Sequence, residues 1–189
     1  LESANLKGTN LSSVKLMRGS LKGQHLNKMN LSGSNMSEAN LTDTEFRSAN
    51  LSKIEAAKAS FRDSDLKQAK LVGANLKGVN LVDANLNGAN LEGANLSGAK
   101  LNDTNLAGAN MSRANLFGVD LESANLEGTN LSSMNLMGAS LKGQHLKKAN
   151  LSGSNLSEAN LTDTELGGAN LNRIDAEKAS FKGSYLKQA

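Results

Sequence analysis

Leucine recurs at every fifth position of this chain. All 31 Leu residues fall within the 38 positions that run from Leu1 to Leu186 in steps of five, and the other seven positions hold Met, Phe or Ala. A period of five fits neither the 3.6-residue turn of an α-helix nor the two-residue alternation of a long strand. We therefore expect short extended segments of about three residues, each followed by a tight turn.

Three further columns of restricted composition accompany the leucines. The residue two before each Leu position is Ala in 19 of 38 places, the residue just before it is Asn in 21 of 37, and the residue two after it is Gly in 16 of 38. Residues two apart in an extended segment point the same way, so the Leu and Ala columns are expected to face inward together. Asn and Gly tolerate tight-turn backbone, which predicts that both columns belong to turns.

The pattern resembles the A-(D/N)-L-x-x unit of the pentapeptide-repeat family. It is seen in Ala84-Asn85-Leu86-Asn87-Gly88 and again in the pentads 89–93 and 94–98, and the five-residue spacing covers all 189 residues. The resemblance implies an all-β fold, a right-handed quadrilateral β-helix (β-solenoid) with four pentapeptides in each 20-residue coil. At ~4.8 Å per coil, about nine coils would form a rod roughly 45 Å long.

A longer repeat lies inside the short one. Residues 1–69 reappear at 121–189 with 51 identities, an offset of 120 residues, and 70–120 form the intervening coils. The offset equals six coils of 20, so equivalent residues should share a face of one domain spanning 1–189. The similarity of outward residues fits either a shared binding surface or a recent or engineered duplication. Because neither end shows a cap, we expect either end-to-end self-association or flanking sequence of a longer repeat protein.

Composition excludes several classes of function. The absence of Cys leaves no disulfide framework, zinc-cysteine cluster or thiol nucleophile. The net charge of +3 comes without a run of like charges, and the surface carries few aromatics, so no direct nucleic-acid binding is expected. No apolar run is long enough to cross a membrane. The glycines recur every few pentads as turn residues and do not open a helix, as those of a phosphate-binding loop do. No Ser-His-Asp set or carboxylate pair is placed where a scaffold could bring its members together, so we expect neither an enzyme nor a cofactor.

Two sets of outward positions form the candidate interaction surface. Phe117 and Met137 occupy an outward column one coil apart, where exposed large apolar side chains can mark an interface. The second set is an aspartate ladder with one carboxylate per coil, formed by Asp43, Asp63, Asp83 and Asp103. The ladder suits either a divalent cation or a basic partner, or it reflects turn-favouring Asp residues compensated by Arg62 and Lys100.

The function that these features favour is a non-enzymatic structural or protein-interaction rod. A rigid core would fix the spacing of outward side chains, so that residues 20 apart form ladders for an unknown protein partner. Some pentapeptide-repeat proteins resemble DNA and bind DNA gyrase, protecting it from quinolones, and this is the alternative function. A DNA mimic needs a broadly acidic surface, whereas this chain has a net charge of +3.

Overall fold

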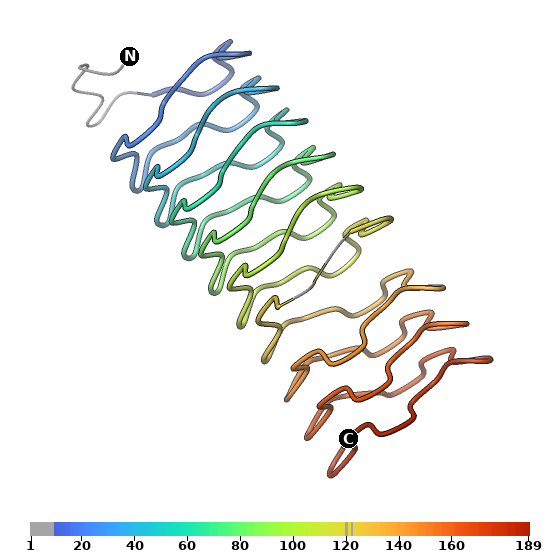
Figure 1. Cartoon of the computed structure of the whole chain (residues 1–189). Helices are drawn as coiled ribbons and strands as arrows, with labels where there is room; N and C mark the ends of the chain where they lie inside the picture. Colours follow the sequence, from blue (N-terminus) through green and yellow to red (C-terminus); the bar gives the residue numbers. More distant parts are fainter. Residues whose placement is uncertain (1–9, 120, 122) are drawn as a thin grey trace.

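The computed structural model describes residues 10–119, 121 and 123–189, which form one stack of coils. The chain advances along the stack, so that residues 10 and 189 lie at opposite ends (Figure 1). The described residues form no helix, and each extended segment is only one bridging residue long. Residues 1–9, which belong to the first copy of the predicted duplication, lie outside the described part of the chain.

The coils are joined by parallel bridges between residues 20 positions apart. Asn30 bridges to Asn50, and Asn85 bridges to Asn105, with the same offset for every bridge of the described chain. A coil therefore contains four pentads, and each pentad lies over its counterpart in the neighbouring coil. This register turns every column of the sequence into a ladder along the rod.

Most described pentads contain a turn with two central residues, closed by a hydrogen bond to the carbonyl of the residue at the leucine position. The carbonyl of Leu91, for example, accepts a hydrogen bond from the amide of Ala94 at 2.9 Å. The third residue of that turn, Gly93, has φ 65°, the geometry of a type II turn. All the described residues at this position have positive φ, 21 of them other than Gly and 15 Gly. Glycine is therefore favoured at this position but not required, and a non-glycine residue there costs about 1–2 kcal/mol of strain.

The Asn column lies outside the turn, contrary to the expectation from its turn preference. Asn90 forms a bridge to the neighbouring coil, and its Oδ1 accepts a hydrogen bond from the Glu92 amide at 3.1 Å. The Nδ2 group of Asn110, one coil further, donates to the same Asn90 oxygen at 3.2 Å. The column therefore caps the turn from the strand side and links neighbouring coils. Both arrangements favour Asn, which is why the preference alone could not distinguish them.

This cap completes the hydrogen bonding of the pentad's five amides. Three amides donate to backbone carbonyls of adjacent coils, one closes the turn, and the fifth donates to Asn. In the pentad 91–95 these bonds are Leu91 to Asn110, Gly93 to Ser112, Asn95 to Ala74, Ala94 to Leu91, and Glu92 to the Asn90 side chain. Since no amide of this pentad is left unpaired, the backbone itself holds the coils together.

The interior is filled by the Leu and Ala columns, as expected. Phe46 and Phe61 meet there with ring centroids 5.6 Å apart and an interplanar angle of 53°. Ile54 and Ala56 are both fully buried, so a larger side chain lies beside a smaller one. Buried hydroxyls bond to backbone carbonyls of the preceding coil, as Thr104 does to Leu81 at 2.8 Å. In the described chain, no buried side-chain nitrogen or oxygen lacks a partner.

Candidate interaction surface

Phe117 and Met137 project from the surface of the rod. Their exposed fractions are 82% and 61%, and Met17 in the same column is also exposed. Each of the two residues lies two positions after an Asn whose side-chain oxygen accepts a hydrogen bond from its amide, at 3.0 Å for Phe117 to Asn115 and 3.2 Å for Met137 to Asn135. The local fold therefore fixes both backbones and directs both side chains outward. Their role in binding stays a prediction.

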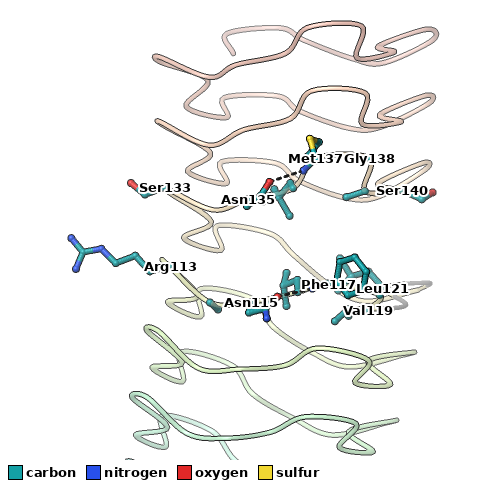
Figure 2. A pocket seen from close by; sticks show the side chains of 15 residues that line it. Arg113, Asn115, Phe117, Val119, Leu121, Ser133, Asn135, Met137, Gly138 and Ser140 are labelled. Carbon is teal, nitrogen blue, oxygen red and sulfur yellow. Dashed lines mark hydrogen bonds between the residues drawn. The ribbon is translucent and has the colours of Figure 1, made fainter.

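The two coils that carry Phe117 and Met137 are not joined by a bridge at this point, whereas the sequence pattern predicts coils at a uniform spacing. Bridges join Asn95 to Asn115 and Asn135 to Asn155, but among the described residues none joins Asn115 to Asn135. A cavity of about 700 Å³ opens here between two coils, and we call it the open crevice. It is lined by residues 113–119, 121, 133 and 135–140, with Phe117 and Met137 on facing coils (Figure 2).

The interruption leaves backbone groups of the crevice without their usual partners. One coil earlier, the amides of Leu96 and Gly98 donate to the carbonyls of Asn115 and Phe117, both at 2.9 Å. The equivalent amides of Leu116 and Gly118 make no bond to the coil of residues 133–140 in the described structure. The crevice is therefore bordered by backbone groups that form a ladder elsewhere in the rod.

Gln144 bonds across to Leu121, one of the residues that line the crevice. Its Nε2 donates to the carbonyl of Leu121 at 2.9 Å. Ser or Thr makes the equivalent bond in other coils, as Thr104 does to Leu81 at 2.8 Å. Leu116 and Leu121 are 9% and 7% exposed, slightly more than the fully buried leucines elsewhere in the core.

The aspartate ladder occupies the left-handed position of successive turns. Asp43, Asp63, Asp83 and Asp103 have φ between 57° and 60°, a conformation that Asp tolerates better than most residues. Arg62 lies between two of them, with its Nε 3.1 Å from Asp63 Oδ2 and its Nη2 3.2 Å from Asp83 Oδ2. The expected compensation by Arg62 is therefore present, while Lys100 forms no ion pair with the described carboxylates.

The structure does not arrange these carboxylates as a metal centre. In the part of the chain that the structure describes, no group of three or more His, Asp or Glu side chains is placed to hold a metal ion. Binding of a cation or of a basic partner by the aspartate ladder stays a prediction. Calorimetric titration with calcium tests it, because a titration without heat would contradict the cation interpretation.

The structure contains two histidine–glutamate pairs that the sequence pattern did not predict. His25 Nδ1 lies 3.0 Å from Glu45 Oε1, and its repeat equivalent His145 lies 3.1 Å from Glu165 Oε2. A hydrogen bond from the Asn27 side-chain amide, and to a smaller extent one from His25, holds the pKa of Glu45 below its usual range. Both pairs are exposed, so they contribute little to stability. The partners are 20 residues apart, and writing the sequence in rows of 20 would have revealed them.

The chain belongs to the pentapeptide-repeat family. The family model, described as pentapeptide repeats in eight copies, matches residues 20–52, 59–98, 94–132, 135–173 and 154–189. The family is characterised by right-handed β-helices, and the match indicates no catalytic family. Among curated proteins, no significant relative is found. The structure also contains no described helix long and apolar enough to cross a membrane.

Several solved structures of pentapeptide-repeat proteins are similar to the chain. HetL, involved in heterocyst differentiation regulation in Nostoc sp. strain PCC 7120, is 30% identical over 93% of this chain and 89% of its own, with a TM-score of 0.42. QnrB1, a plasmid-mediated fluoroquinolone resistance protein, is 16% identical over 89% of this chain and 91% of its own, with a TM-score of 0.43. A thylakoid-lumen protein of Arabidopsis thaliana is 28% identical over 59% of this chain and 70% of its own, with a TM-score of 0.29.

Proposed function

We propose that the chain is a non-enzymatic, four-sided rod that presents ordered ladders of outward side chains to a protein partner. The observation that supports this function most directly is the constant 20-residue register of the bridges. Because the backbone fixes this register, the outward side chains of a column keep their spacing whether or not a partner is bound. A partner then binds without an entropic cost for ordering the rod.

The distribution of polar groups agrees with a binding role. The buried polar side chains are spread along one inward column and bond to backbone carbonyls, as Thr44 does to Leu21 and Thr164 does to Leu141. Such hydroxyls are held in the core and are not gathered in a cleft. The charged side chains lie outside and pair between neighbouring coils, as Arg18 does with Glu38 at 3.0 Å. The chemistry that a partner can reach is therefore displayed on the sides of the rod.

A set of single-face variants tests this function. One variant replaces the charged outward residues of one side with Ser, and three others do the same for the remaining sides. We expect partner cross-linking to fall sharply for one variant while the circular dichroism melts of all four stay alike, because the core is unchanged. Equal cross-linking by all four variants would contradict recognition of an ordered ladder.

DNA mimicry with binding to DNA gyrase is the alternative function. The similarity to QnrB1 does not favour it, because 16% identity and a TM-score of 0.43 reflect a shared repeat pattern. The net charge of +3 also differs from the strongly acidic surface that a DNA mimic requires. A supercoiling assay with purified gyrase separates the two functions, since only a DNA mimic should inhibit the enzyme.

A further inference from the structure

We propose that the open crevice binds an extended peptide segment of another protein as an added β-strand. The proposal deepens the interaction role proposed above, because it names the chemistry of one partner. It concerns the space between two coils, whereas the ladders lie on the sides of the rod. Three observations support it. Both rims carry unpaired backbone groups, apolar side chains lie between them, and the other described residues are already folded into coils.

Both rims of the crevice carry unpaired strand edges. On one rim the amides of Leu116 and Gly118 point toward a neighbour that is out of reach, and within the described residues they have no backbone acceptor. On the other rim the Asn135 amide lacks the bond that the equivalent Asn115 makes to Ala94 at 2.9 Å. An extended peptide supplies carbonyls and amides along both of its edges, so it can pair with both rims at once.

The side chains of the crevice add apolar surface to these edges. Leu116, Val119 and Leu136 line it, and the much more exposed Phe117 and Met137 lie on facing coils (Figure 2). Successive residues of a bound strand point to opposite sides, so alternate apolar side chains of the peptide would pack on this surface. The crevice therefore favours a strand with alternating apolar residues.

Arg113 adds a preference for an acidic residue at one end of the peptide. It lies on the side of the crevice away from Leu121 (Figure 2). Its side chain is 75% exposed, and its Nη1 is 3.7 Å from Glu92 Oε1, at the long end of ion-pair distances. A carboxylate on the peptide could approach this guanidinium more closely. The preferred ligand is thus an extended peptide with an acidic residue followed by alternating apolar residues.

A second copy of this chain is a poor occupant of the crevice. Its described residues from 10 onward are already wound into coils, and their pentads bond to at least one neighbouring coil. Entry of such a segment would require a coil to unwind and lose its ladder. A peptide that is not yet part of a sheet loses no such bonds.

The proposal is tested with the blocked peptide acetyl-Glu-Val-Thr-Val-Thr-amide and amide hydrogen exchange measured by NMR. In the free protein, Leu116 and Gly118 should exchange roughly tenfold faster than Leu96 and Gly98, because only the second pair is hydrogen-bonded to the next coil. Addition of the peptide should slow exchange at Leu116 and Gly118. Slow exchange at both amides in the free protein would mean that the ladder is closed, and would overturn the proposal.

A second peptide separates backbone pairing from side-chain burial. It has the same sequence with both Val amides N-methylated, which removes two donors and blocks one edge. Each lost hydrogen bond should weaken binding by up to roughly tenfold. Equal affinity of the two peptides, or no binding of either, would contradict addition of a β-strand.

Variants of the exposed residues locate the binding site. Phe117→Ser combined with Met137→Ser should weaken binding of the first peptide, while Met17→Ser should leave it unchanged. Met17 is a matched control because it is exposed in the same column but lies outside the crevice. Equal weakening by the control, or dimerisation through Phe117 in light scattering, would overturn the proposal. The single-face variants test the rod function separately, so the two proposals can fail independently.

Discussion

Truncation of one buried side chain measures how strongly the rod depends on its core. Ile54 is fully buried beside the fully buried Ala56, so Ile54→Ala leaves two small residues next to each other. Removal of three carbons costs about 2.4 kcal/mol at ~0.8 kcal/mol for each buried methylene. The backbone ladders prevent the coils from collapsing into the space, so the remaining cavity raises the total to roughly 2–5 kcal/mol.

Urea denaturation followed by circular dichroism gives the free energy of unfolding of each variant. The comparison is valid if the dependence on urea keeps the same slope in the variant. Ile174→Ala is the matched control, because Ile174 is the equivalent residue 120 positions later and is only partly buried. We expect it to lose clearly less stability than Ile54→Ala. A loss below about 1 kcal/mol for Ile54→Ala, or equal losses at the two sites, would refute the cavity argument.

Three further predictions concern the turns, the Asn column and the ends of the rod. Gly93→Ala should cost about 1–2 kcal/mol in urea melts, because Gly93 has φ 65° and open space around the added Cβ, so only backbone strain changes. Lys58→Ala, which keeps a non-glycine residue at φ 58°, should not change stability. Asn110→Ala removes the acceptor of the Ser112 amide and the donor to Asn90 Oδ1, so it should cost about 1–2 kcal/mol in urea melts. An unchanged free energy of unfolding would contradict the capping role. Light scattering over a concentration series should show end-to-end association, which a strict monomer would contradict.

The five-residue period was sufficient to predict most of the fold. In an extended segment the inward and outward positions follow from the side-chain alternation, so the Leu and Ala columns had to form the core. The same reasoning placed Phe117 and Met137 on the surface, since they lie outside those two columns. A repeat this short imposes the same constraint in every pentad, so exceptions such as Ile54 beside Ala56 do not obscure it.

The role of Asn was harder to predict because it depends on a partner that the sequence does not show. The Asn90 side chain bonds to the amide of Glu92 and to Asn110 in the neighbouring coil. A preference for turns accounts equally well for a residue inside a turn and for one that caps it. The pairs of histidine and glutamate also join side chains of neighbouring coils, so they become visible only when positions 20 residues apart are compared.

The sequence by itself determined the repeat, the core and the outward columns, because side-chain size and polarity decide which positions are buried. Only the tertiary structure decided where the ladder between coils is closed and where it opens at Leu116 and Gly118. That ladder consists of backbone amides and carbonyls, which are nearly the same in every residue. The columns of the sequence therefore predict uniform stacking, and the separation of two particular coils follows only from their arrangement in space.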